Sequence, residues 1–304
     1  MTDAQMTYQR VGAERISGRN ASRIMHSLAR HRKVVVGLTI LAVVVAAAVF
    51  AHWLAPRDPQ AQNLSQAHTP PFWLAGGQPE YPLGTDYIGR DVLSRLIYGA
   101  RVSLLVGFGG VLIASLLGIA FGLLAGYFGG WVEAIVMRIA DTILAVPWIL
   151  FVLFVVGILG SSLVNVIVIF GITDFPLFTR TVRGEVLAVR EQQFIDAAVS
   201  IGAQPWRVLR SHVLPNIAGT VITVATFELA SMVLWEASLG FLGLSVPPTI
   251  PSWGNMMAEG RSYLRSDWWL ATFPGIAVML LTLGINLTGD GLRFVLDPKS
   301  RGRE

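Results

Sequence analysis

The 304-residue chain contains no cysteine and few charged residues. Without cysteine it can form no disulfide, bind no metal through a thiolate and use no thiol nucleophile. Charged residues make up 14% of the sequence, against about 25% in a typical soluble domain. The charges are also clustered, and 53% of the residues are hydrophobic. This composition predicts an all-α polytopic membrane protein.

Two motifs of hydrolytic enzymes are also missing. No G-x-x-x-x-G-K-[ST] phosphate loop occurs, so the chain cannot supply ATP hydrolysis itself. H-E-x-x-H is absent, and none of the five histidines lies in the middle of an apolar stretch. An intramembrane hydrolase would therefore lack its base or its metal. We expect no catalytic residue, no metal site and no bound cofactor in this chain.

Six apolar stretches are candidates for membrane-spanning helices, each of which needs about 20 residues to cross the bilayer. The predicted spans are residues 34–54, 102–128, 139–160, 163–178, 217–244 and 270–288. The fourth is short and is interrupted by Asp174 and Pro176. The first could instead be a cleaved signal peptide, but its apolar run of about 21 residues exceeds the usual length. We expect it to remain as a span.

The distribution of Lys and Arg predicts the orientation. Most of the 23 basic residues fall in the N-terminal tail, in the loop between the fourth and fifth spans, and in the C-terminal tail. Basic loops stay in the cytoplasm, so both termini are expected there. The net charge of +4 is then a topology signal and not a nucleic-acid footprint. The predicted division is a cytoplasmic tail (1–33), a first helix (34–54), an extracytoplasmic loop (55–101), a five-helix core (102–290) and a cytoplasmic tail (291–304).

Small residues recur at every fourth position of the second predicted span. They are Gly110, Ala114, Gly118, Gly122 and Gly126. Residues at this spacing share one helix face, and small side chains let two helix backbones approach closely in lipid. The pattern predicts dense helix packing, with a pore-lining stripe as the alternative.

Three acidic residues lie deep in predicted spans: Asp174, Glu228 and Glu236. Because an acid in lipid is costly, such residues usually have a partner or a function. They are candidates for a water-filled translocation pathway, and packing against a polar partner is the alternative. Asp141, nearer the cytoplasmic side, is expected to pair with Arg138 three residues before it.

Two extracytoplasmic segments do not look like spans. Residues 86–101 predict a short amphipathic helix at the membrane interface. Residues 246–268 contain "PPTIPSWGNMMAEG", which is too rich in proline and glycine for a span. Either could be an ordinary loop or a docking surface for a protein that delivers substrate.

The loop between the fourth and fifth spans has a pattern of its own. Residues 184–201 predict a helix, which Gly202 ends. Its apolar stripe would consist of Leu187, Phe194, Ala198 and Ile201. Pro205 suits the first turn of a second, short helix, and Pro215 is expected to stop it. The face of this second helix would consist of Trp206, Leu209 and Val213.

A helix, a glycine turn and a short rigid helix favour a protrusion that fits a cytoplasmic partner over a merely solvated loop. About thirty residues between two spans leave no room for a DNA-binding domain. The loop also resembles a known motif. "DAA", three residues, Gly202, nine residues and "HVLP" are similar to the EAA loop of ABC-importer permeases. Asp196 stands where that family usually has Glu, and His212 replaces a commoner aliphatic residue.

The EAA resemblance implies a coupling helix that contacts an ATPase subunit. The implied coupling residues are Asp196, Ala197, Ala198, Gly202, Trp206, His212, Leu214 and Pro215. Further stretches resemble the C-type permease of dipeptide and oligopeptide importers. These are "LGTDYIGRDVLSRLIYGARVSL" (83–104), "LAGYFGG" (124–130), "ASLGFLGLSVPPTIPSWGNMM" (237–257) and "NLTGDGLRFVLDP" (286–298). The resemblance covers roughly residues 25–298. At Asp174 this chain departs from the family's small or uncharged residue.

The family resemblance implies a type I ABC importer permease fold in the cytoplasmic membrane. It further implies a homologous B-type permease, two ATPase subunits that bind ATP and Mg, and an extracytoplasmic substrate-binding protein. Dipeptides or oligopeptides are the expected substrates, with glutathione, opines and nickel chelates as alternatives. A proton-coupled secondary transporter built on the three intramembrane acids is a remote alternative, because no internal repeat is seen.

Overall fold

The computed structural model describes residues 32–296, and within this range the regular elements are helices without a strand. The predicted cytoplasmic tails, 1–33 and 291–304, lie largely outside the described residues. The helices are α2 (Arg32–Val49), α3 (Ala51–Leu54), α4 (Val92–Phe128), α5 (Gly130–Ala145), α6 (Trp148–Leu159), α7 (Leu163–Arg190), α8 (Gln193–Ser200), α9 (Pro205–Val208), α10 (Leu214–Phe241), α11 (Trp253–Gly260) and α12 (Trp269–Leu296), with short turns η1 (Leu64–Gln66) and η3 (Arg261–Tyr263) and a π-helical turn η2 (Leu209–Val213).

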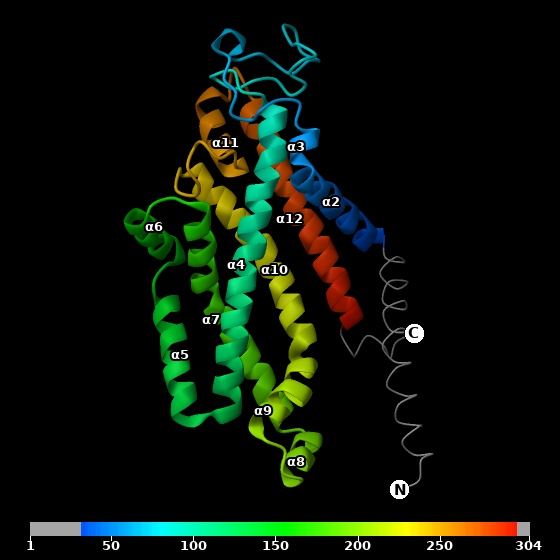
Figure 1. Cartoon of the computed structure of the whole chain (residues 1–304), viewed down its shortest axis with the longest axis vertical. Coiled ribbons are helices and arrows are strands. Elements are labelled where there is room, and N and C mark those ends of the chain that lie inside the picture. Colours follow the sequence, from blue (N-terminus) through cyan, green and yellow to red (C-terminus); the bar gives the residue numbers. More distant parts are fainter. Residues whose placement is uncertain (1–31, 297–304) are drawn as a thin grey trace.

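Five helical stretches are long and apolar enough to cross a membrane: α2, α4, α7, the continuous rod formed by α9, η2 and α10, and α12. The pair α5–α6 adds a sixth if both helices belong to one broken span. The predicted all-α architecture of about six spans is therefore confirmed. Figure 1 shows α4 running through the long axis, α2 and α12 on one side of it, and α5, α6 and α7 on the other.

The third predicted span, 139–160, is not one straight helix. α5 and α6 are bent by 88° where they meet at Val146 and Pro147. Proline lacks the backbone N–H that continues a helix, and it pushes the residue before it out of the helical region. Val146 is accordingly extended, with ψ at 129°. The predicted stretch therefore contains two helices, which count as one span if they form a broken span together.

α5 begins at Gly130, before the predicted start at 139, and two of its charged residues have partners on α7. Arg180 donates to Asp141 at 2.5 Å, and Arg183 forms an ion pair with Glu133. Asp141 therefore pairs across to another helix and not with Arg138, as the spacing had predicted. These two ion pairs join α5 to α7.

Two helices are longer than predicted. α7 continues through Pro176 to Arg190, so the apparent interruption of the fourth span is no break. α4 begins at Val92, where the Asp91 carboxylate accepts from the backbone N–H of Ser94 at 2.8 Å, and runs unbroken for 37 residues. The separate interfacial helix predicted for 86–101 does not exist. At about 1.5 Å per residue α4 is far longer than a bilayer is thick, so part of it stands outside the membrane.

The small residues of α4 pack against α7. A Cβ added at Gly118 would lie 2.2 Å from the Cβ of Phe178, and one at Gly122 would lie 2.6 Å from the Cβ of Val182. Gly126 meets Val186 in the same way. The predicted dense packing is confirmed, and the stripe lines no pore within this chain.

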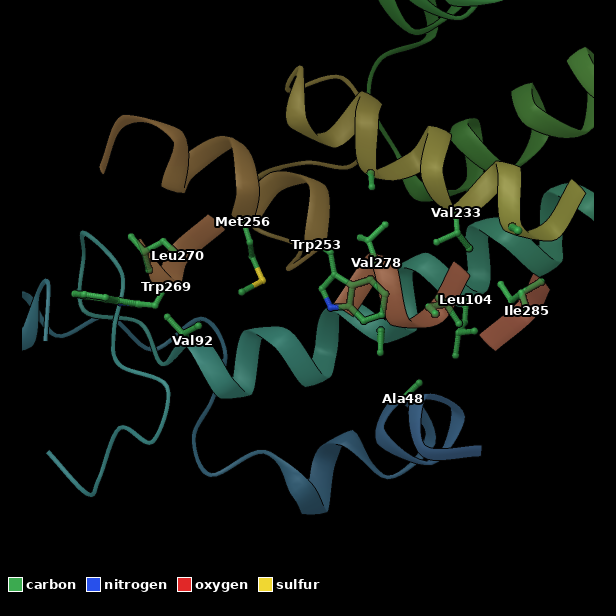
Figure 2. Packing of buried hydrophobic residues seen from close by; sticks show 14 residues of the cluster. Ala48, Val92, Leu104, Val233, Trp253, Met256, Trp269, Leu270, Val278 and Ile285 are labelled. Atoms are coloured by element: carbon green, nitrogen blue, oxygen red, sulfur yellow. The ribbon is translucent and has the colours of Figure 1, made fainter. Parts of the chain in front are cut away.

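A second contact surface lies at the end of the molecule that carries the long loop of residues 55–91 (Figure 1). Figure 2 shows Trp253 of α11 between α4 and α12, where its indole N–H donates to the carbonyl of Leu96 at 2.9 Å. Met256 and Val278 lie in the same buried cluster. A helix too polar to span the membrane is thereby held rigidly against two helices that do.

Candidate coupling site

The segment from α8 to α9 forms one end of the molecule, opposite the long loop of residues 55–91 (Figure 1). The helix predicted for 184–201 is in fact two helices, because α7 ends at Arg190 and α8 starts at Gln193. The Arg190 side chain donates to the carbonyl of Tyr127 at 2.9 Å, and its guanidinium lies over the Tyr127 ring. This contact fixes the end of α7 to the end of α4 just before the chain turns.

The inner face of this segment is apolar and buried. Ile195 of α8 and Val208 of α9 pack with Val182 and Val186 of α7, and each is at most 3% exposed. Leu209 and Val213 of η2 belong to the same cluster. Burying four or five such side chains stabilises the segment by several kcal/mol, at about 1.5–3 kcal/mol for each. The segment is therefore packed firmly against α7 and is not a loose linker.

Gly202 ends α8 as the sequence predicted. Its φ of +83° lies in the left-handed region, which glycine adopts without steric penalty. The N–H of Ala203 donates to the carbonyl of Ala198 at 3.0 Å, and the N–H of Gly202 donates to that of Val199 at 2.9 Å. This pair of bonds is the Schellman motif. A Cβ added at Gly202 would meet no atom within 4 Å, so the backbone conformation alone requires glycine here.

Pro205 begins α9 as expected, but Pro215 does not stop it. The helix widens into the π-helical turn η2 and continues into α10, with Pro215 in the first turn of α10. In a π-turn the hydrogen bond skips one more residue, so the carbonyl facing a proline ring can be relieved. The short helix and the fifth span are consequently one rod from residue 205 to 241.

The outer face carries large apolar side chains. Ile201 is 87% exposed and Trp206 is 69% exposed. The stripe predicted for the first helix is wrong, because Ala198 is buried whereas Phe194 and Ile201 face outward. Trp206 is likewise exposed, although Leu209 and Val213, which were predicted to share its face, are buried.

The structure separates the eight predicted coupling residues into two groups. Ala198 lies on the buried face, and His212 and Leu214 are half-buried beside it. The exposed members are Asp196, Ala197, Gly202, Trp206 and Pro215. The His212 ring lies 6.3 Å from the ring of Phe194, so the π-turn also contacts α8. The segment can present an apolar knob with charged neighbours to another molecule.

The three intramembrane acids do not share one environment. Glu236 is fully buried, and its two carboxylate oxygens accept from the hydroxyls of Ser103 and Ser245, each at 3.1 Å. It joins α4, α10 and the turn after α10. For this residue the structure matches the alternative of packing against polar partners.

Asp174 and Glu228 are different. They lie on α7 and α10 and are half-buried. Among residues 32–296 neither forms a side-chain hydrogen bond or an ion pair within 4 Å. The same part of the chain holds no group of three His, Asp or Glu residues that could bind a metal.

No sequence pattern predicted the ionic cluster at the opposite end of the molecule, beside the long loop of residues 55–91. Asp86 Oδ2 accepts from Arg90 Nε and from Arg95 at 2.6 Å each. Glu259 Oε2 accepts from the same two arginines at 2.8 and 2.6 Å. Asp86 and Arg95 are no more than 3% exposed. The cluster joins the long loop, α4 and α11, which are up to 169 residues apart.

Burial and charge act in opposite directions in this cluster. Burial alone would lower the pKa of Arg90, but the carboxylates of Asp86 and Glu259 outweigh it, and the pKa is raised. At the neighbouring Asp91, burial raises the pKa of the carboxyl above 3.8, although Ser94 donates to it. Asp91 Oδ1 has no hydrogen-bond partner among the described residues. The stretch "TDYIGRD" was the only sequence signal of this ionic cluster, because Glu259, which pairs with the two arginines, lies in another segment.

Comparison with known proteins identifies the family. Residues 118–302 match the family model described as binding-protein-dependent transport system inner membrane component. Residues 21–71 match the N-terminal TM domain of oligopeptide transport permease C. A di/tripeptide transport system permease protein, DppC, from Pseudomonas aeruginosa is 42% identical, covering 90% of each chain. A dipeptide transport system permease protein DppC from Alkalihalophilus pseudofirmus is 40% identical, over 90% of this chain and 88% of that one.

The fold is also found among solved structures. A chain of the MetNI methionine ABC transporter, in an inward-facing conformation, aligns with a TM-score of 0.56 at 20% identity. The alignment covers 67% of this chain and 96% of that one. At this identity the likeness shows the fold alone. The chain therefore belongs to the family of inner membrane components of binding-protein-dependent transport systems, as a multi-pass permease subunit of an ATP-binding-cassette importer whose ATPase is carried by separate subunits.

Proposed function

We propose that this chain is the C-type permease of a dipeptide or oligopeptide importer, with residues 102–290 as its transport core. It pairs with a homologous B-type permease, two ATPase subunits and an extracytoplasmic substrate-binding protein. It lies in the cytoplasmic (inner) membrane with both termini in the cytoplasm. The names of the relatives, which are dipeptide permeases at 40% identity or more, support the substrate class. The observation that carries the coupling role is the exposed knob of Ile201 and Trp206.

This knob is costly unless another protein covers it. Ile201 and Trp206 stand out from a well-packed base, on the side where the basic loops predict cytoplasm. Aromatic side chains that lose water at the centre of a contact often carry much of its binding energy. We infer that the knob fits a cleft on an ATPase subunit, and that Gly202 and Asp196 set its shape and charge.

The rod from α9 to α10 provides a route for the ATP-driven motion. A push on α9 acts on 37 continuous helical residues, about 55 Å in length, that end at the extracytoplasmic turn after Phe241. A helix transmits such a displacement along its axis, so closure of the ATPases tilts or shifts α10 as a unit. This motion would switch the two permeases between inward and outward access.

The coupling role is tested by co-purification of the ATPase subunits with Trp206→Ala. The expected result is a weaker complex, by about 2 kcal/mol or roughly 30-fold in affinity, and loss of uptake. Trp131→Ala is the matched control, because Trp131 is 75% exposed but lies on α5. If Trp206→Ala assembles and transports like Trp131→Ala, the coupling assignment fails.

The orientation can be tested with single cysteines, since the chain has none of its own. A membrane-impermeant thiol reagent added outside intact cells should label Ala75→Cys and Ser262→Cys. It should spare Ser211→Cys. All three positions are exposed in this chain. Labelling of position 211 from outside would reverse the proposed topology.

We also propose that Asp174 and Glu228 border the translocation pathway. Unpaired carboxylates in hydrocarbon cost roughly 2.5–3.5 kcal/mol each on insertion scales, so water or substrate is the expected neighbour. Asp174→Asn and Glu228→Gln should change uptake while leaving assembly intact. Unchanged uptake in both would end this assignment.

The substrate itself is best tested on the substrate-binding protein of the same transport system, with glutathione, an opine and a nickel chelate compared against dipeptides.

A further inference from the structure

An ordered turn in the extracytoplasmic loop holds two aromatic side chains outward. Phe72 is 55% exposed and Trp73 is 49% exposed, although the backbone around them is fixed. The N–H of Leu74 donates to the carbonyl of Pro71 at 2.9 Å, and Leu74 itself packs against the buried cluster around Trp253. The two rings are therefore presented by a rigid base and are not exposed by chance in a loose loop.

The same turn lies against the beginning of α12. The Trp73 ring is 6.2 Å from the ring of Phe273, and the Trp268 ring is 5.8 Å from the same ring. Trp268 is also exposed, at 38%. We call Phe72, Trp73 and Trp268 the aromatic patch. It surrounds the first turns of a membrane-spanning helix.

The depth of the patch follows from the length of α12. Near its cytoplasmic end, Gly291 lies against Val34, next to the basic residues Arg32 and Lys33. About 20 helical residues cross 30 Å of hydrocarbon. Counted back from Gly291, they end close to Phe273, which places this ring at the extracytoplasmic boundary of the hydrocarbon. Trp53, 75% exposed in the helix α3 that follows α2, stands at the corresponding end of the neighbouring span.

We propose that the aromatic patch is seated in the headgroup region of the extracytoplasmic leaflet, so that residues 70–74 anchor the long loop to the lipid surface. Tryptophan is enriched at this level because its ring is apolar and its N–H is polar. The segment "PPFWLAGG" (70–77) carries no charge, which suits lipid better than a polar docking surface. Exposed apolar residues continue below the patch along α12, at Ile276, Leu280 and Leu283.

Spin-label accessibility tests this anchor in the complete importer in lipid nanodiscs. A nitroxide at Phe72→Cys leaves Trp73 and Trp268 in place. Its collisions with O₂, which concentrates in lipid, are compared with those with a water-soluble nickel chelate. The reference labels are Ala61→Cys, exposed in the same loop, and Val43→Cys, 63% exposed in the middle of α2. The O₂-to-nickel ratio at 72 should be severalfold above that at 61 and below that at 43.

Two outcomes would overturn the proposal. A ratio at 72 equal to that at 61 would mean that the patch faces water and is free for a binding protein. Low collision rates with both reagents would mean that another subunit covers it. Because the measurement requires neither ATP nor substrate, failure here leaves the proposed coupling role untouched.

Discussion

The two ends of this permease differ in which side chains they bury and which they expose. At the end that carries the long loop of residues 55–91, charged side chains are buried and paired, as in the cluster of Asp86, Arg95 and Glu259. At the end formed by α8 and α9, apolar side chains are exposed, as at Ile201 and Trp206. The first end is completed within the chain, whereas the second is left for another molecule to complete. Mutations should therefore damage stability at one end and assembly at the other.

The largest effect is expected from Arg95→Met. Removing one partner of a buried ion pair leaves the others uncompensated and costs roughly 3–5 kcal/mol. Glu80→Ala is the control, because Glu80 is 71% exposed in its pair with Arg57 and such pairs contribute about 0–1 kcal/mol. Thermal unfolding of the purified subunit measures both. Equal melting temperatures would show that the cluster does not hold this end together.

Glycines with positive φ give a second comparison of the two ends. A Cβ at Gly89 would lie 1.8 Å from the carbonyl oxygen of Asn63, whereas one at Gly202 would meet nothing within 4 Å. Gly202→Ala should cost about 1–2 kcal/mol from its backbone conformation alone. Gly89→Ala should cost clearly more, because the backbone must also move. Gly184→Ala, at a helical position with open space, is the control and should not destabilise the protein.

The pH dependence of stability should contain a contribution from Asp91. Burial raises its folded-state pKa above the ordinary 3.8, so the folded protein holds this proton more tightly than the unfolded chain does. Its contribution to stability is therefore fully present below the unfolded pKa and is lost as the pH rises through the folded pKa. The unfolding free energy of the parent minus that of Asp91→Asn should therefore fall as the pH rises above about 4. A constant difference across that range would contradict the shift.

The smallest effect is expected at the cytoplasmic knob. Ile201→Ala and Trp206→Ala should each change the unfolding free energy of the isolated subunit by no more than about 0.5 kcal/mol. Ile195→Ala, on the buried face of the same segment, should cost roughly 2 kcal/mol or more. Unfolding of the subunit without its ATPases separates the two faces. A large loss from Trp206→Ala would make its side chain part of the core.

The fold could be predicted from the sequence wherever the position of a helix depended on its own residues alone. Runs of apolar residues placed α2, α10 and α12 closely, because crossing lipid imposes a length. The errors arose where one helix depends on another. Asp141 was expected to pair with Arg138 on its own helix, whereas its partner Arg180 lies on α7. Pro176 looked like a break, although α7 continues through it.

At the candidate site too, features set by the local backbone could be predicted, and features set by distant residues could not. Gly202 could be located because a left-handed turn is a local property of the backbone. The exposure of Trp206 could not be derived, because a spacing of three residues places it near Leu209 but does not fix which side chains the neighbouring helices cover. The partners of Arg95 were also out of reach, since Glu259 is 164 residues away and no local pattern connects them.

That separation has a consequence for biogenesis. At about 5–20 residues per second, the ribosome needs on the order of ten to thirty seconds after Arg95 to make Glu259. Until then, the cluster of Asp86, Arg90 and Arg95 lacks the carboxylate of Glu259. The hydrogen bond from Gln60 to Thr249 and the pair of His68 with Asp267 must form equally late. The end that carries the long loop thus closes only after α11 and the start of α12 have been made, and a chain truncated before α11 would leave Arg90 and Arg95 without the carboxylate of Glu259.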